Sequence, residues 1–137
     1  MVKFLLDTNA LSEAVRPSPN AGFLKRLRAN EAKLALASVT LHEAIYGLER
    51  LPDGKRKEGL REYVRSVVSK VPVLPYDAKA AEWHARERVR LEAAGRTLPY
   101  ADGQIASIAV VNGLALVTAN VRDFRPVEGL RVENWLA

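Results

Sequence analysis

Acidic residues at four separated positions could supply the carboxylates of one catalytic site. They are Asp7, Glu43, Asp102 and Asp123. The first and the last follow short apolar runs typical of buried strands, and the other two stand near the starts of helical patterns. In open α/β sheets, ligands bind beyond the carboxyl ends of the strands. We therefore expect the four carboxylates to converge at one edge of a sheet.

Carboxylates gathered in this way repel one another unless a cation holds them together. The chain has no cysteine and only two histidines, which excludes cysteine or histidine-rich metal sites. Oxygen ligands suit hard ions such as Mg²⁺ or Mn²⁺. An ion of this kind activates water and stabilises the transition state of phosphoryl transfer. The chemistry that these residues predict is hydrolysis of a phosphodiester bond.

Two of the acids also have a purely structural interpretation. Asp7 is a suitable cap for a helix that begins near residue 10. Glu43 follows Thr40 with the Thr-x-x-Glu spacing of a capping box. In favour of a function, Gly47 lies one turn after Glu43 on the same helical face, where a missing side chain would let a backbone or a substrate approach.

The two later acids allow the same choice between structure and function. Asp102 stands in a predicted first helical turn, where the helix dipole favours an acid. It shares a face with Ile105 and Ala106, which should turn inward, and a half-buried carboxylate is costly without a counter-charge. Asn120 and Asp123, each taken alone, are typical turn residues.

Composition places the chain among globular proteins with one domain. Its 137 residues are enough for one hydrophobic core. Twenty-one basic and 16 acidic residues give a net charge of +5, which makes a polyanionic partner plausible. No apolar segment is long enough for a signal peptide or a membrane span, so we expect a cytoplasmic protein.

Short apolar runs alternate with longer helical patterns, which indicates an α/β fold with a parallel sheet. The predicted strands cover residues 2–6, 34–37, 73–74, 114–117 and, less clearly, 130–135. The predicted helices cover residues 10–15, a segment capped by Asn20, and residues 40–51, 57–70 and 100–111, with a further long helix that begins at its cap Asp77 and stops at Gly95. His42 and His84 are interpreted as residues on helix surfaces.

The motifs, taken in order, resemble those of the PIN-domain ribonucleases, and more narrowly the VapC/FitB-like toxins of type II toxin–antitoxin pairs. The matching segments are Leu5-Leu6-Asp7-Thr8-Asn9, Ser38-Val39-Thr40-Leu41-His42-Glu43 with Gly47, Tyr100-Ala101-Asp102 with Ile105-Ala106, and Thr118-Ala119-Asn120 with Asp123-Phe124. The resemblance covers nearly the whole chain. It implies a single PIN domain over residues 1–137, with a mostly parallel central sheet of four to five strands and helices on both faces.

The resemblance also implies roles for individual residues. Asp7, Glu43 and Asp102 would be the core acids and metal ligands, with Glu43 either reaching the ion or positioning the attacking water. Family members differ over whether the position of Asn120 or that of Asp123 carries a fourth acid; here Asp123 would act through water. Thr8 and Thr118 would orient carboxylates or water from just outside the metal shell, with Asn120 beside them.

The implied cofactor is Mg²⁺ or Mn²⁺, and the implied partners are an RNA substrate, a second copy of the chain in a homodimer, and a cognate antitoxin that places an Arg against the acids. No membrane partner is expected. Two alternatives stay open. One is a non-catalytic module that binds RNA or a protein partner. The other is an aspartyl-phosphate phosphatase, although Asn9 stands where that chemistry needs a second Asp.

Overall fold

A computed structural model of the chain describes residues 1–136. Its strands are β1 (Phe4–Leu6), β2 (Leu34–Ala37), β3 (Val73–Leu74), β4 (Ala115–Val117) and β5 (Val132–Glu133). Its helices are α1 (Thr8–Glu13), α2 (Ala21–Ala29), α3 (Ser38–Glu49), α4 (Lys55–Lys70), α5 (Ala78–Ala93), α6 (Tyr100–Val111) and α7 (Val121–Phe124), with a 3-10 turn over Glu31–Lys33.

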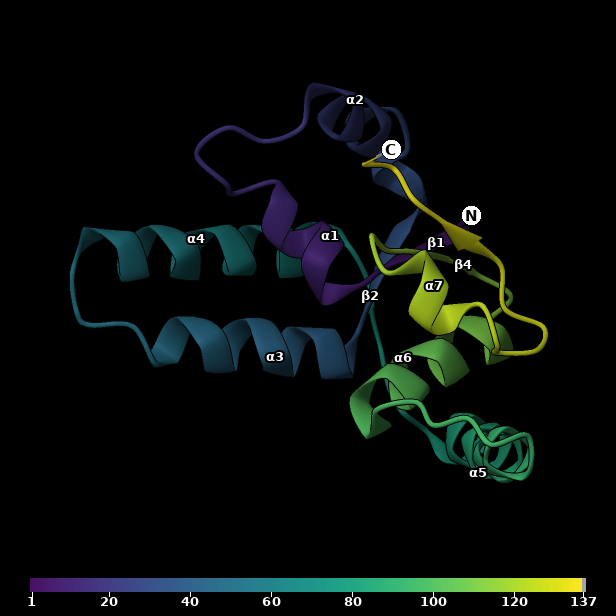
Figure 1. Cartoon of the computed structure of the whole chain (residues 1–137). Coiled ribbons are helices and arrows are strands. Elements are labelled where there is room, and N and C mark those ends of the chain that lie inside the picture. Colours follow the sequence, from purple (N-terminus) through teal and green to yellow (C-terminus); the bar gives the residue numbers. More distant parts are fainter. Residues whose placement is uncertain (137) are drawn as a thin grey trace.

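The strands form one parallel sheet in the order β3-β2-β1-β4-β5 (Figure 1). The chain builds outward from β1 in one direction through β2 and β3, and then returns to the other side of β1 with β4. The strand order therefore reverses between β1 and β4, and ligands of open α/β sheets bind beyond the carboxyl ends of the strands at such a point. The register pairs Leu6 with Val117, so the residues that follow these two strands emerge side by side.

Alternate residues of the central strands pack into two cores, one on each face of the sheet. Leu5 and Leu116 pack against α5 and α6. Leu6 and Val117 pack against the helices of the opposite face, where Phe23 of α2 is fully buried. Because side chains alternate along a strand, this two-sided burial explains why β1 and β4 are continuously apolar. The three-layer α/β architecture agrees with the sequence-based expectation.

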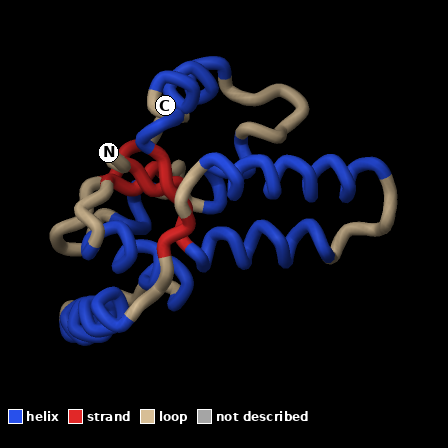
Figure 2. Tube along the Cα trace, turned by 180° about the vertical axis from the view of Figure 1, so that it is seen from behind, coloured by secondary structure: helices blue, strands red, loops and turns tan. Residues whose placement is uncertain are grey.

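Helices α3 and α4 form an antiparallel pair that extends away from the sheet, which both views show (Figures 1 and 2). On the other side of the sheet α5 packs along α6. Two caps follow the sequence prediction: the Asn20 side chain accepts a hydrogen bond from the N–H of Phe23 at 2.8 Å, and that of Asp77 from Ala80 at 3.0 Å.

The predicted elements are present, with shifted ends. The first helix begins at Thr8, directly after Asp7, and the third begins at Ser38. The segment predicted as a turn after β4 contains the short helix α7. Among residues 1–136, none of the helices combines the length and the apolar character that crossing a bilayer requires.

Candidate active site at the carboxyl end of the sheet

Asp7 is held in place by the start of the first helix. It follows β1 and caps α1, with its Oδ1 atom accepting a hydrogen bond from the N–H of Ala10 at 2.9 Å. Burial raises the pKa of Asp7, the nearby charge of Glu43 adds to the rise, and a hydrogen bond with the Thr118 side chain opposes it. The capping interpretation is therefore confirmed, and the same carboxyl group also faces a second acid.

Glu43 is joined to the first helix by a side-chain hydrogen bond. The hydroxyl of Thr8 donates to Glu43 Oε1 at 2.9 Å, which links α1 to α3. The capping-box prediction is wrong, because α3 begins at Ser38 and Thr40 lies inside the helix. The buried hydroxyl of Thr40 has no hydrogen-bond partner within residues 1–136. The carboxylate of Glu43 therefore does not cap its own helix and instead lies near Thr8 and Asp7.

Asp102 lies close enough to the other three acids for their charges to act on its carboxyl group. It stands in the first turn of α6 and is partly buried. Burial raises the pKa of Asp102, and the charges of Glu43, Asp7 and Asp123 raise it further, in that order. Acids that lie up to 95 residues away from Asp102 along the chain therefore act on its carboxyl group.

The segment after β4 contributes the remaining predicted residues. Thr118 is buried beside Asp7, its side chain opposes the rise of the Asp7 pKa, and its hydroxyl accepts a hydrogen bond from the N–H of Asn120 at 3.0 Å. Asp123 lies on α7, exposed, and acts on Asp102 through its charge. No side-chain hydrogen bond is found for Asn120 within the described chain, so its contribution there is the backbone bond to Thr118.

The donor set suits a hard divalent cation. All four acids and the two threonines offer oxygen ligands. Burial and, to a smaller extent, neighbouring negative charge raise the pKa values of Asp7 and Asp102, and a cation would neutralise that charge. In residues 1–136 no three acidic or histidine side chains already stand close enough to share one ion directly. Mg²⁺ keeps several of its waters and takes only one or two carboxylates directly, so the residues fit a partly hydrated ion.

A broad cleft opens beside Thr8 and Glu43. It has a volume of about 1120 Å³ between α1, α3 and α4. Gly47 lines it, and a Cβ on this glycine would meet nothing within 4 Å, so no backbone packs there and the space is open to a ligand. Lys55 and Arg56 also line the cleft and give it positive charge.

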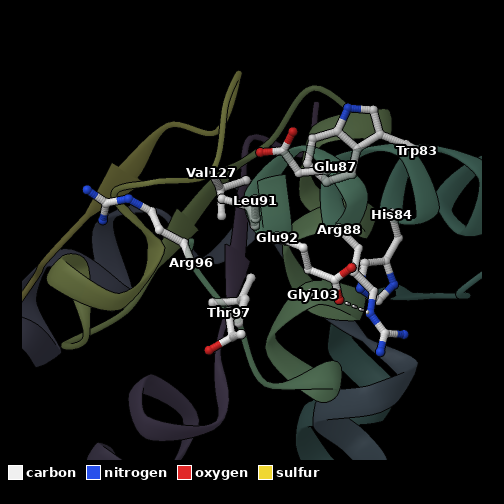
Figure 3. Close-up of a pocket in the computed structure, with 12 residues that line it drawn as sticks. Trp83, His84, Glu87, Arg88, Leu91, Glu92, Arg96, Thr97, Gly103 and Val127 are labelled. Atoms are coloured by element: carbon white, nitrogen blue, oxygen red, sulfur yellow. Dashed lines mark ion pairs between the residues drawn. The ribbon is translucent and has the colours of Figure 1, made fainter. Parts of the chain in front are cut away.

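The structure places His84 differently from the sequence-based prediction. His84 is 6% exposed rather than a surface residue, and its Nδ1 atom shares a hydrogen bond of 2.8 Å with the hydroxyl of Tyr76. The ring lies against Gly103, where a Cβ would come within 2.2 Å of His84 Nε2 (Figure 3). This contact fixes the helix turn that carries Asp102. The only feature of the sequence that could have indicated this contact is Gly103, a glycine near the start of an otherwise apolar helix.

Comparisons with known proteins identify the family of the chain. A model of the PIN domain matches residues 4–130, and the chain belongs to the PIN-domain family. The relatives narrow the comparison to the VapC and FitB proteins. The chain is 38% identical over 135 residues to the tRNA(fMet)-specific endonuclease VapC of Shigella flexneri, covering 98% of this chain and 99% of that protein.

Solved structures give the same result. The DNA-bound VapBC complex of Salmonella typhimurium contains a chain that is 33% identical, with a TM-score of 0.88 and coverage of 98% of this chain and 99% of that one. FitAcB from Neisseria gonorrhoeae contains a chain that is 30% identical, with a TM-score of 0.90 and coverage of 96% and 97%. The resemblance and the fold expected from the sequence are both confirmed.

Proposed function

We propose that the chain, as a single PIN domain over residues 1–137, is a metal-dependent endoribonuclease and the toxin of a toxin–antitoxin pair. The observation that carries the proposal is that the hydrogen bond of 2.9 Å from Thr8 to Glu43 ties the carboxylate of α3 to the residue that follows Asp7 at the carboxyl end of β1. The pKa of Asp102, raised by burial and by the charges of Glu43, Asp7 and Asp123, supports it. Relatives named as VapC endonucleases and ribonucleases support RNA as the substrate.

In this proposal Asp7 and Asp102 bind Mg²⁺ or Mn²⁺ directly, and Glu43 binds the ion or positions the attacking water. A bound ion would activate that water and stabilise the charge that develops on the phosphate. Thr8 orients Glu43 through its hydroxyl, as its bond of 2.9 Å supports. Holding a carboxylate in one orientation in this way typically improves metal affinity or activity by about 10- to 100-fold.

The residues after β4 have supporting roles. Thr118 orients Asp7, and the backbone N–H of Asn120 holds Thr118 in turn. Asp123 is exposed and acts through water, adding negative charge beside Asp102. Asn120 therefore does not replace Asp123 as the fourth acid, because an amide carries no charge that would help to hold a cation.

Cleavage of RNA under controlled metal conditions tests the enzyme. Single-stranded and structured RNA are incubated with the purified chain and Mg²⁺, Mn²⁺ or a chelator. We expect cleavage with either metal, none with the chelator, and none for Asp102→Asn. Asp53→Asn is the matched control, because the Asp53 side chain is fully exposed and lies in the α3–α4 loop. Cleavage that persists in the chelator would overturn the metal mechanism; metal-dependent RNA binding without cleavage would favour the non-catalytic alternative.

The proposed partners are a cognate antitoxin and a second copy of the chain. The solved structure of VapBC-5 from Mycobacterium tuberculosis, which contains a chain 26% identical to this one, is named as a member of the VapBC family of toxin–antitoxin systems, and an acidic pocket attracts the Arg of such a partner. Co-expression with the neighbouring reading frame should give a complex that does not cleave RNA. Light scattering should give twice the mass of one chain. A lone, monomeric and uninhibited enzyme would overturn this part of the proposal; a cytoplasmic location stays a prediction.

A further inference from the structure

Four arginines surround a second hollow on the surface, away from the cleft beside Glu43. The hollow has a volume of about 540 Å³ and lies between the end of α5 and the helix α7. Its arginines are Arg90, Arg96, Arg122 and Arg125, and we call it the arginine hollow. Arg96 also borders a smaller pocket that His84 and Arg88 line on its other side, and the Arg96 side chain points away from those two residues (Figure 3).

Among residues 1–136, carboxylates pair with Arg90 but with none of the other three arginines. Arg90 donates two hydrogen bonds to Glu87, at 2.8 and 2.6 Å, and lies 3.1 Å from a carboxylate oxygen of Glu128. Within residues 1–136, no carboxylate lies within 4.0 Å of the guanidinium nitrogens of the other three. Three guanidinium groups around one hollow, without protein counter-charges, are suited to binding an anion.

The walls of the arginine hollow are tied together firmly. Arg90 also donates to the carbonyl of Pro126 at 2.8 Å, and the N–H of Glu128 donates to Glu87 at 2.9 Å. The buried carboxylate of Glu87 therefore joins α5 to the segment that follows α7. These bonds set the relative positions of the backbone segments that carry the arginines before any ligand arrives, which lowers part of the entropic cost of binding.

Helix α7 connects the arginine hollow to the acidic site. Arg122 is the direct neighbour of Asp123, whose charge acts on Asp102, and Arg125 lies one turn further along. An extended polyanion with one phosphate at the acids would thus pass close to positive charge on the same short helix. Guanidinium groups bind phosphate oxygens in a bidentate manner, which makes arginine well suited to this ligand.

We propose that Arg96, Arg122 and Arg125 form a phosphate subsite for the RNA backbone beside the bond that is cleaved. This inference rests on the proposed ribonuclease function and adds the path of the substrate across the surface. The subsite recognises phosphodiester groups and not bases, so it supplies affinity without selecting a sequence.

Binding of RNA to a cleavage-deficient protein tests the subsite. The full chain with Asp7→Asn is titrated with a fluorescein-labelled single-stranded RNA, and anisotropy is measured at several salt concentrations. In this background Arg96, Arg122 and Arg125 are all changed to Gln. The control changes Arg26 and Arg28 of α2 and Lys25 beside them to Gln; all three are exposed, on a helix that packs against the opposite face of the sheet.

The two variants remove the same charge, so they separate a local subsite from general attraction. We expect the arginine-hollow variant to bind RNA at least about 10-fold more weakly than the Asp7→Asn protein. The plot of the logarithm of the association constant against the logarithm of the salt concentration should also become less steep, by about 0.7 for each phosphate contact removed. The control should change affinity less than about twofold. Equal binding by the two variants would overturn the inference, and so would loss of a protein partner without loss of RNA binding.

Cleavage assays keep this inference distinct from the proposed function. If the wild-type chain cleaves RNA while the arginine-hollow variant binds RNA normally, the subsite is wrong and the enzyme proposal stands. If the wild-type chain cleaves no RNA but the arginine-hollow variant alone loses binding, the subsite stands and the enzyme proposal fails. Circular dichroism of both variants should match wild type, because the substituted side chains are exposed.

Discussion

Replacing Gly103 by Ala tests how the packing of α5 fixes the start of α6. The added Cβ would lie 2.2 Å from Nε2 of His84 and 2.9 Å from two ring carbons. The ring is buried and bonded to the hydroxyl of Tyr76, so it cannot turn aside without losing that bond. Overpacking costs about 1–3 kcal/mol, and a contact this close falls at the upper end. Alanine has a higher helix propensity than glycine, which offsets about 1 kcal/mol of this cost. The free energy of unfolding should therefore fall by about 2 kcal/mol.

Urea denaturation followed by circular dichroism measures this loss directly. Gly59→Ala is the matched control, because Gly59 lies inside α4 and a Cβ there would meet nothing within 4 Å. The control should therefore gain up to about 1 kcal/mol from helix propensity. We also expect Gly103→Ala to cleave RNA more slowly, since moving the first turn of α6 displaces Asp102.

A double-mutant cycle decides whether His84 is the cause. In a His84→Ala background the obstructing ring is gone, so Gly103→Ala should become neutral or stabilising. The coupling free energy between the two positions should be about 2–3 kcal/mol, within the range found for residues in contact. A Gly103→Ala protein as stable as wild type, or substitutions whose effects simply add, would refute this account of the helix contact.

Further predictions concern the charges of the site and of α5. Asp102→Asn removes a disfavoured charge, so without metal it should melt above wild type near pH 7; a lower melting temperature would contradict this. The pKa values of Asp7 and Asp102 are raised above 3.8, so just above that pH the native state binds more protons than the unfolded chain. The wild-type protein therefore loses stability as the pH rises through the raised pKa values, and the difference in melting temperature between Asp102→Asn and wild type should grow over the same range. Thr8→Val should slow cleavage by about 10- to 100-fold while Thr8→Ser retains most activity, whereas equal rates would show that the bond to Glu43 is dispensable. Glu87→Gln should lose about 1–3 kcal/mol of unfolding free energy in urea, and an unchanged midpoint would show that its bonds contribute little.

Much of the fold could be predicted from local patterns. All five predicted strand segments contain a strand, and the signal was strongest for β1, β2 and β4, because strands buried on both faces of a parallel sheet are continuously apolar. Asn20 and Asp77 were recognisable as helix caps, since a cap depends on a few neighbouring residues only. The Thr40 capping box was wrong, because α3 begins at Ser38, directly after β2, and Thr40 therefore lies inside the helix.

The sequence by itself predicted which residues are candidates for the chemistry, because their types, their order and their places after strands are those expected of a site for a hard cation. Only the tertiary structure decided how those residues act on one another. The bond from Thr8 to Glu43, the joint effect of the other acids on Asp102 and the burial of His84 against Gly103 depend on side chains that are distant along the chain. Contacts of that kind arise from the packing of whole helices and strands, and no local pattern of residues encodes them.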